Sequence, residues 1–207
     1  MPTETFLNLS KEKKDKIIKA AKKEFARVPI SEVSIKNIVE EAQIARGSFY
    51  QYFVSKEDLL KYLLKDKMEK VDEIAKESIE KSHGDIFEVY ISMYDFVMSK
   101  KPKNEDLEFH RQILSNVKTS DESFYALRNF INLDKVNGPF SKEEFISKID
   151  RSKFVDKSDE ELSAIIKLLF MITKKAVVSN FKYESKEAAR KEYIRMIDII
   201  KRGVYNG

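Results

Sequence analysis

The fold is decided by the stretch Ser34–Phe53, which reads SIKNIVEEAQIARGSFYQYF. Its first part begins at Ser34, a residue type favoured at helix N-caps. Apolar residues follow at helical spacing: Ile35, Ile38, Val39 and Ala42. A break at Gln43-Ile44-Ala45 follows. The second part, Arg46–Phe53, places Phe49 and Phe53 four residues apart on one helical face. Two short helices joined by a turn of about three or four residues form a helix-turn-helix.

The other positions of the second helix suit a polyanion, because most of their side chains can donate hydrogen bonds. Arginine matches the two acceptors of guanine, and glutamine matches the donor–acceptor pair of adenine, so Arg46 and Gln51 are the predicted base readers. Gly47 lets the backbone approach closely, and Ala45, without a donor, would touch only a thymine methyl. Phosphate contacts are predicted for Ser34, Ser48, Tyr50, Tyr52 and Lys56.

A third helix is predicted to begin after Ser55. Ser55 is its N-cap, and Asp58 three residues later completes a capping box. Lys56 stands at the helix N-terminus, where the helix dipole disfavours a cation. A nearby phosphate would remove that conflict; the alternative is a solvated lysine that tolerates a small penalty.

Residues 44–60, IARGSFYQYFVSKEDLL, resemble the DNA-binding end of the TetR family of bacterial transcriptional regulators. The stretch from Ser10 to about Leu64 follows that family's N-terminal domain, whereas the rest of the chain has only a compatible helical pattern. Gln43 stands where the family usually has glycine, and Ala45 where it often has a hydroxyl residue. A left-handed backbone at Gln43 would cost on the order of 1–2 kcal/mol.

Positive charge is concentrated around this motif. Ser10–Lys56 contains eleven Lys and Arg against six Asp and Glu, a net charge of +5, while the whole chain carries +4. A solvated helix face is the simplest explanation of a lysine-rich segment. Its coincidence with an independent helix-turn-helix favours an electrostatic footprint for nucleic acid instead.

The flanking patterns predict an all-α chain of two domains. Ser10 to about Arg27 is a helix that packs on the helix-turn-helix, and Pro29 prevents its continuation. The helix opened by Ser55 runs to about Lys81, where Ser82-His83-Gly84 ends it. We predict a helix-turn-helix DNA-binding domain over residues 1–55 and a helical effector-binding and dimerisation domain over residues 56–207.

The middle third holds most of the aromatic residues. Helices are predicted over Asp85–Ser99, Asp106–Val117, Ser120–Leu133 and Lys142–Ile149. The first is apolar on nearly every side, which is typical of a buried helix. These aromatics either fill a core or line a ligand pocket, with Tyr94 and His110 as its polar groups. The candidate lining is Phe87, Tyr90, Tyr94, Phe109, His110, Phe124, Phe130 and Phe170.

Two long helices are predicted to close the chain, from Ser158 to about Tyr183 and from Glu187 to Arg202, with Gly203 as a stop. Ser158 is the predicted N-cap of the first, with Glu161 at its N3 position. Both carry more apolar surface than one helical hairpin can bury. A two-fold interface in which each partner contributes two helices to a four-helix bundle would cover it, as the resemblance also implies. The predicted interface residues are Ile165, Phe170, Val177, Tyr193, Ile197 and Ile200.

Several function classes are disfavoured by the sequence. It has no cysteine, two histidines, and none of the common nucleotide-binding, hydrolase or zinc-protease motifs, so we expect no enzyme, no metal site and no cofactor. It shows no signal peptide and no apolar run near the roughly 20 residues of a membrane helix. We therefore expect a soluble cytoplasmic protein without a membrane partner.

Three functional hypotheses follow. The favoured one is a homodimeric regulator that binds a palindromic DNA operator, a repressor released by an unknown small apolar or aromatic effector. The second is a DNA-binding protein of the same fold that acts architecturally or through a protein partner. The third is a helical interaction module whose helix-turn-helix is structural.

Overall fold

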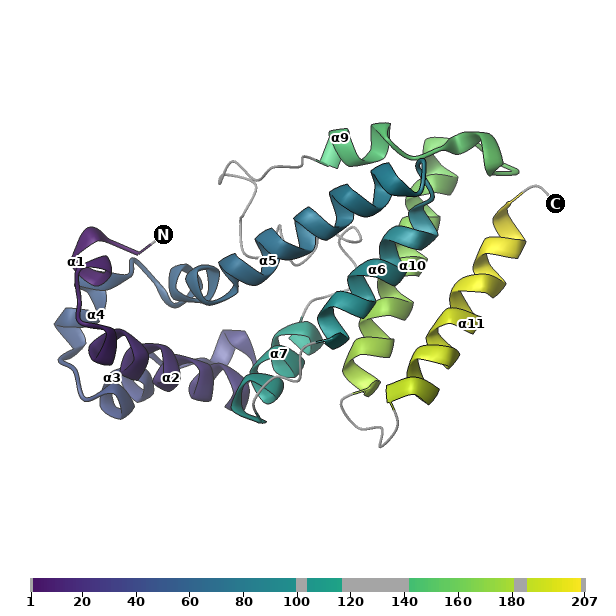
Figure 1. The fold of residues 1–207 in the computed structure, drawn as a ribbon. Coiled ribbons are helices and arrows are strands. Elements are labelled where there is room, and N and C mark those ends of the chain that lie inside the picture. The colour runs from purple at the N-terminus through teal and green to yellow at the C-terminus, as the bar shows by residue number, and fades with distance from the viewer. Residues whose placement is uncertain (1, 100–103, 117–141, 181–185, 206–207) are drawn as a thin grey trace. The chain divides into compact units, whose positions relative to one another are not determined.

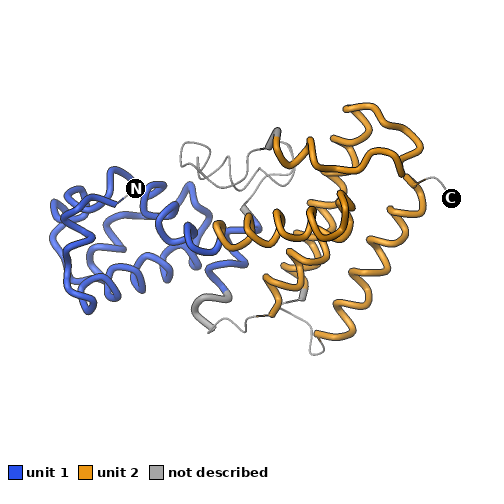
Figure 2. Tube along the Cα trace, turned by 45° about the horizontal axis from the view of Figure 1, so that its top comes forward, with its two compact units in different colours: residues 1–67, 102–117, 130–133 blue, residues 68–101, 118–129, 134–207 orange. Residues whose placement is uncertain are grey.

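The computed structural model describes residues 2–99, 104–116, 142–180 and 186–205 (Figure 1). The regular structure of these residues is helical, apart from one isolated antiparallel bridge between Phe154 and Tyr205, and this confirms the predicted all-α fold. The chain forms two compact units (Figure 2). Of the described residues, 2–67 and 104–116 belong to the first unit and the others to the second.

The first unit is built on the predicted helix-turn-helix. Its core contains Phe25, Ile38, Phe49 and Phe53, each 0% exposed, so the predicted apolar faces are buried. Its helices are α1 (Glu4–Leu7), α2 (Lys11–Arg27), the 3-10 turn η1 (Ile30–Glu32), α3 (Ile35–Ala42), α4 (Arg46–Tyr52), the first part of α5 (Lys56–Lys81) and α7 (Asn104–Asn116).

Helix α2 spans nearly the predicted residues, and the Lys13 N–H donates to the Ser10 hydroxyl at its N-cap at 3.4 Å. Helix α7 packs on α2, with the rings of Phe109 and Phe25 6.3 Å apart. The predicted domain boundary at residue 55 stays a prediction. By packing, the division falls inside α5, between residues 67 and 68, and α7 joins the first unit.

The second unit contains α6 (Ile86–Ser99), α9 (Lys142–Ser147), the 3-10 turn η4 (Arg151–Lys153), α10 (Asp159–Asn180) and α11 (Lys186–Val204). Helix α6 packs against both α10 and α11 (Figure 1). The Phe87 N–H donates to Asp85 Oδ1 at 2.9 Å at the start of α6. The Glu161 N–H donates to the Ser158 hydroxyl at 3.2 Å, as predicted for the cap of α10.

Buried tyrosines join these three helices. The Tyr90 hydroxyl on α6 donates to the Ile166 carbonyl on α10 at 3.2 Å, and the Tyr193 hydroxyl on α11 donates to the Tyr90 carbonyl at 3.2 Å. Tyr193 also shares a 2.7 Å hydrogen bond with Thr173, and its ring stacks on Tyr94 with the centroids 4.2 Å apart. Buried hydroxyls that find partners in this way avoid the cost of desolvation.

The C-terminal end of α11 is fastened to the start of α6. Lys201 Nζ lies 2.6 Å from Asp85 Oδ2, and the Tyr205 hydroxyl donates to Asp85 Oδ1 at 3.3 Å. The Tyr205 ring meets Phe87 and Phe154 edge-on. One carboxylate thus caps α6 and also holds the end of the chain's last helix.

Three details differ from the predictions or fall outside them. Helix α1 was not predicted, and Gly203 is not a helix stop, because α11 continues to Val204. The predicted helix Ser120–Leu133 lies outside the described residues.

Across the described ranges, none of the helices combines the length and the hydropathy needed to cross a membrane.

The turn after α5 depends on Gly84. His83 and Gly84 both have positive φ, 54° and 85°, and the Gly84 N–H donates to the Ile79 carbonyl at 2.9 Å. A Cβ on Gly84 would lie 2.4 Å from the Asp150 nitrogen and 2.7 Å from the Lys148 oxygen. The turn is therefore pressed against backbone that a side chain would displace.

We predict that Gly84→Ala destabilises the protein by about 1–2 kcal/mol from backbone strain, and by more once the close contacts are included. Urea unfolding would measure the loss. Gly203→Ala is the matched control. Gly203 lies in α11, and no described atom is within 4 Å of an added Cβ, so this substitution should raise the free energy of unfolding by about 0.5–1 kcal/mol. Equal effects of both substitutions would contradict the role of the turn.

Candidate nucleic-acid interface

The turn between α3 and α4 has a left-handed backbone at Gln43, with φ 56° and ψ 45°. The Gln43 N–H donates to the Glu40 carbonyl at 3.2 Å, and the Ile44 N–H donates to the Val39 carbonyl at 3.0 Å. This pair of bonds is the Schellman motif, which normally uses glycine at the left-handed position. Gln43 therefore has the left-handed conformation that was considered for this position.

Most of the predicted DNA-contacting residues lie on α4 and its N-cap, whereas Ser34 is the N-cap residue of α3 and Lys56 begins α5. Phe49 faces the core, while Ala45, Arg46, Gly47 and Gln51 are exposed. Ser48 and Tyr52 are half-buried, and Tyr50 is 49% exposed, which leaves a large aromatic ring in solvent beside the polar groups. The short helix therefore presents one donor-rich face away from the unit's core.

Gly47 on this face has no role in packing. No described atom lies within 4 Å of a Cβ built on it, and its φ is not positive. Glycine inside a helix costs roughly 0.5–1 kcal/mol relative to alanine. The packing of the described residues therefore does not account for a glycine at position 47.

A buried carboxylate on α2 holds the start of α3. The Glu24 side chain is 6% exposed and accepts hydrogen bonds from Arg27 Nε at 2.8 Å and Arg27 Nη2 at 2.9 Å. Glu24 Oε1 also accepts from the Ser34 N–H and from Asn37 Nδ2, both at 3.0 Å. Hydrogen bonding from Arg27, assisted by Ser34 and Asn37, lowers the pKa of the Glu24 carboxyl.

Ser34 occupies the predicted N-cap position, but among the described residues its hydroxyl makes no capping hydrogen bond. Glu24, on another helix, instead accepts from the backbone N–H of Ser34 itself. The role of Glu24 was not predicted, since a glutamate in a lysine-rich helix is usually a surface residue. Arg27 three residues later was the available signal of a pair.

Lys56 ties the start of α5 to the segment before α3. Its ammonium donates to the Ser31 carbonyl at 2.8 Å and to the Val33 carbonyl at 3.1 Å. These carbonyls offset the unfavourable helix dipole, so no phosphate is needed to explain a lysine there. Its phosphate contact stays a prediction.

The cap of α5 is close to the predicted box. The Asp58 N–H donates to the Ser55 hydroxyl at 3.3 Å. The Asp58 carboxylate accepts from the Val54 N–H at 3.2 Å, one residue before the usual partner in a capping box. The predicted N-cap is confirmed, and the return bond reaches one residue further back.

The candidate ligand-lining residues are divided between the two units. Phe87, Tyr90 and Tyr94 are at most 1% exposed in the second unit, and Phe170 is half-buried on α10. Phe109 and His110 belong to the first unit. Phe124 and Phe130 lie outside the described residues. Four of the described candidates, Phe87, Tyr90, Tyr94 and Phe109, are therefore buried core residues of two different units and do not line one common pocket.

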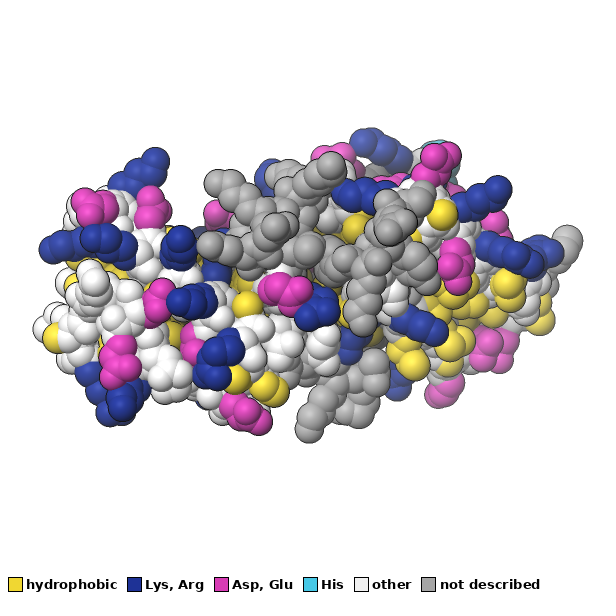
Figure 3. All heavy atoms as spheres, turned by 90° about the horizontal axis from the view of Figure 1, so that it is seen from below, with side chains coloured by type: hydrophobic (Ala, Val, Ile, Leu, Met, Phe, Trp, Pro, Cys, Tyr) yellow, Lys and Arg dark blue, Asp and Glu magenta, His cyan; other side chains and the backbone are white. Residues whose placement is uncertain are grey.

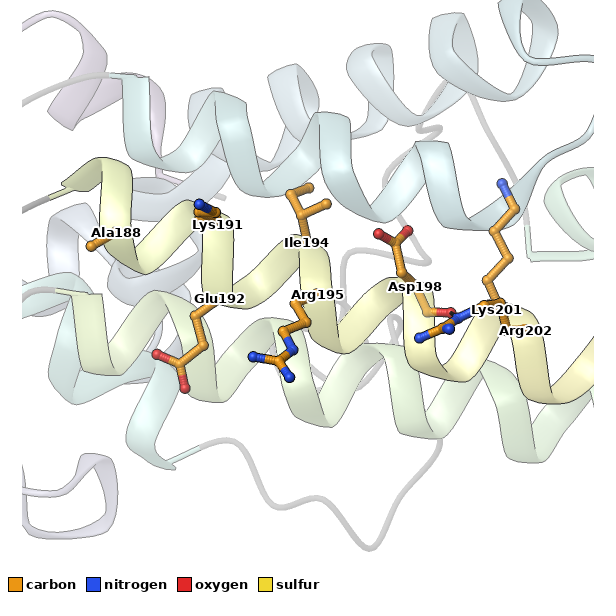
Figure 4. Close-up of a pocket in the computed structure, with 8 residues that line it drawn as sticks. All are labelled: Ala188, Lys191, Glu192, Ile194, Arg195, Asp198, Lys201 and Arg202. Atoms are coloured by element: carbon orange, nitrogen blue, oxygen red, sulfur yellow. Dashed lines mark hydrogen bonds between the residues drawn. The ribbon is translucent and has the colours of Figure 1, made fainter.

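Two open grooves mark the second unit. One follows α11, with a volume of about 750 Å³ and charged side chains of both signs along it (Figure 4). The other, of about 720 Å³, lies between α5 and α6 and is lined by Ser78, Ser92 and acidic side chains. Neither groove includes any of the described candidate lining residues.

Four of the six predicted dimer-interface residues are already buried within the chain. Ile165, Val177, Tyr193 and Ile197 are at most 4% exposed, so their side chains offer no surface to a partner. Phe170 and Ile200 are partly exposed. The large apolar side chains that the second-unit helices do leave in solvent are Leu168, Met171 and Ile199, between 46% and 54% exposed.

Comparisons with family models cover most of the chain. Residues 17–63 match the model described as bacterial regulatory proteins, tetR family. Residues 85–204 match the model described as tetracyclin repressor-like, C-terminal domain. No curated protein sequence matches the chain.

Solved structures share the fold at low identity. A TetR family transcriptional regulator from Chloroflexus aurantiacus J-10-fl is 23% identical, with all of both chains covered and a TM-score of 0.61. The fatty acid degradation regulator FadR from Bacillus halodurans is 18% identical over 94% of this chain and 96% of its own, with a TM-score of 0.55. FadR from Bacillus subtilis, in complex with stearoyl-CoA, is 19% identical over 93% and 100%, with a TM-score of 0.52.

Because Gln43 is left-handed, Gln43→Gly is expected to raise the free energy of unfolding by about 1–2 kcal/mol without changing a contact. Thermal and urea unfolding would measure the gain. Gln43→Ala, which removes the side chain but keeps a Cβ, should bring no such gain. A glycine variant no more stable than the wild type would show that this turn is unstrained.

Glu24→Gln is expected to lower the unfolding free energy at pH 7 by about 1–3 kcal/mol, because a charge-assisted site loses its charge. A lowered pKa stabilises the fold above the unfolded value, about 4.3, and this contribution disappears as pH falls through the lowered folded pKa. The difference from wild type should therefore shrink on acidification. Urea unfolding at pH 7 and pH 3 would measure it.

Glu12→Gln is the matched control on the same helix. Glu12 forms a solvent-exposed pair with Lys16, so its loss should change the unfolding free energy far less than the loss of Glu24 does. The role assigned to Glu24 fails if both variants behave alike at pH 7.

Proposed function

The chain belongs to the TetR family of bacterial transcriptional regulators, and from this premise we propose that it is a homodimeric repressor that a small ligand releases from its operator. The observation that carries the DNA-binding part is the exposed face of α4. Helix α4 would enter the major groove, with Arg46 and Gln51 reading base edges and Ser48, Tyr50 and Tyr52 holding phosphates. Gly47 would let the groove wall approach the backbone.

The charge of the first unit supports this role. The +5 excess over Ser10–Lys56 coincides with the unit that carries α4. Binding that rests partly on phosphate contacts weakens as the salt concentration rises, because dissolved cations compete with lysine and arginine side chains for the phosphates. The proposal therefore requires strong salt dependence together with sequence preference, whereas a helical interaction module would show neither.

Dimerisation is proposed through α10 and α11. Ala164, Leu168 and Met171 are exposed on α10 at the spacing i, i+4, i+7, and Ile199 is exposed on α11. Figure 3 shows hydrophobic side chains clustered on the surface of the second unit. Isolated apolar side chains on a surface are ordinary, but a stripe at helical period is typical of a helix that packs on another.

The groove along α11 also suits a two-fold contact. Lys191, Glu192, Arg195 and Asp198 line it, with both signs of charge on one helix (Figure 4). In an isologous interface the same surface meets itself, so each charge can face its opposite in the partner. Two recognition helices related by this axis would require a palindromic site with half-sites about one helical turn, roughly 34–36 Å, apart or a multiple of it.

The ligand part rests on family membership and on the aromatic content of the second unit. One observation favours the alternative, a regulator without a small-molecule effector: Phe87, Tyr90 and Tyr94 are buried, and the Tyr90 hydroxyl already has a partner. Titration of the operator complex with small apolar and aromatic compounds separates the two. Release by any of them supports an effector, and unchanged operator binding throughout supports the alternative.

Gly47→Ala should separate folding from DNA binding. Helix propensity predicts a gain of about 0.5–1 kcal/mol in stability, while a methyl group in a closely approached surface should weaken operator binding by about tenfold or more. The probe is a genomic DNA fragment selected by its binding to the wild-type protein, and fluorescence anisotropy measures the affinity of each variant for it. Gly203→Ala makes the same chemical change outside α4 and should bind normally. A Gly47→Ala variant with wild-type affinity would exclude close approach at this position.

Leu168→Glu should produce monomers with poor operator affinity, because it places a charge in the proposed bundle. Sedimentation velocity measures the oligomeric state, and anisotropy measures binding. Ser163→Glu, exposed on another side of α10, is the control and should stay dimeric. Leu168 is a better test than Ile197, whose replacement would disrupt the protomer's own core. A monomeric Leu168→Glu protein that binds its operator at full strength would refute dimeric recognition.

A further inference from the structure

The N-terminal segment is fastened to the C-terminal end of α4. The Thr3 N–H donates to the Tyr52 carbonyl at 3.0 Å, and the Thr3 hydroxyl donates to the Gln51 carbonyl at 2.6 Å. The same hydroxyl accepts from the Phe6 N–H at 3.4 Å and so caps α1. One threonine side chain therefore joins the start of α1 to the end of the helix that carries the predicted base readers.

Phe6 anchors this connection in the core. It is 0% exposed, and its ring centroid lies 4.7 Å from that of Phe53, 5.2 Å from that of Tyr62 and 5.9 Å from that of Tyr52. Phe53 follows α4 directly, and Tyr62 is on α5. The ring thus fixes α1 against the junction between α4 and α5, and with it the position of Thr3.

Helix α4 needs support from outside. It has seven residues, well below the roughly 12–15 at which an isolated helix becomes even marginally stable. The last carbonyls of any helix have no partner within it. Thr3 supplies donors to two of them, at Gln51 and Tyr52. Ala45 at the other end makes no side-chain capping bond to any described residue, so the C-terminal support is the stronger of the two.

We infer that the segment 2–9 is a positioning element for the recognition helix, with Thr3 as the positioning residue and Phe6 as its anchor. This inference rests on the proposed DNA-binding role of α4. Without the Thr3 hydroxyl the end of α4 frays more often, and the apparent affinity falls with the population of the competent conformation. Sequence-specific binding should suffer more than non-specific binding, because base readout needs a fixed helix and phosphate attraction does not.

The test compares three substitutions in the full-length protein. Thr3→Val removes the hydroxyl but keeps the shape and the backbone N–H, and Thr3→Ser restores a hydroxyl. Thr5→Val makes the same change at an exposed threonine within α1 and serves as the control. Two readouts are collected: amide hydrogen exchange of residues 49–53 without DNA, and affinity for a retained genomic fragment and for a scrambled duplex.

We expect Thr3→Val to speed exchange at the end of α4 and to weaken binding of the genomic fragment about two- to tenfold, the range of one hydrogen bond. Binding to the scrambled duplex should change less, and Thr3→Ser and Thr5→Val should behave like the wild type. Unchanged exchange and affinity in Thr3→Val would overturn the inference. An equal loss on both duplexes would also overturn it. A wild-type protein that prefers no DNA sequence would instead refute the proposed function, while the exchange data would still report on the contact.

Discussion

The buried carboxylate of Glu24 fixes where α3 begins, and the presentation of α4 depends on that position. It binds Arg27 on its own helix and the Ser34 N–H and Asn37 side chain at the start of α3. Only a tight turn separates α3 from α4, so the end of α3 decides where α4 starts. Lys56 adds a second constraint, because its two carbonyl bonds hold the segment before α3 to the start of α5.

Several residues in and next to α4 are unfavourable for a helix. Gln43 before it is left-handed, Ala45 caps poorly, and Gly47 lies in its first turn without a packing reason. Local preference and global fold usually agree, and the exceptions concentrate at functional sites. Here the support comes from distant segments, through Thr3, Phe6 and Glu24. A short, exposed and glycine-containing helix is thereby held in one orientation, which the proposed base reading would require.

Periodicity and capping residues were enough to predict α2 to α6 and the caps at Ser55 and Ser158, because these signals are local. Gln43 could be predicted to be left-handed only through the family resemblance. Periodicity could not reveal which neighbour covers an apolar face. Helix α10 has two such faces, so Ile165 and Val177 were predicted to meet a partner chain, whereas they lie in the protomer's core and Leu168 and Met171 are exposed. The bonds of Glu24 and Lys56 are long-range, and α1 is too short to give a periodic signal.

Base reading by α4 is tested most directly by selecting binding sites from random duplex DNA with the wild-type protein and with Gln51→Ala. We expect the wild type to enrich a palindrome, and the variant to enrich the same palindrome with the preference relaxed at one position in each half-site. Identical base preferences in the two selections would contradict base reading by Gln51. Failure of the wild type to enrich any sequence would contradict sequence-specific DNA recognition by α4.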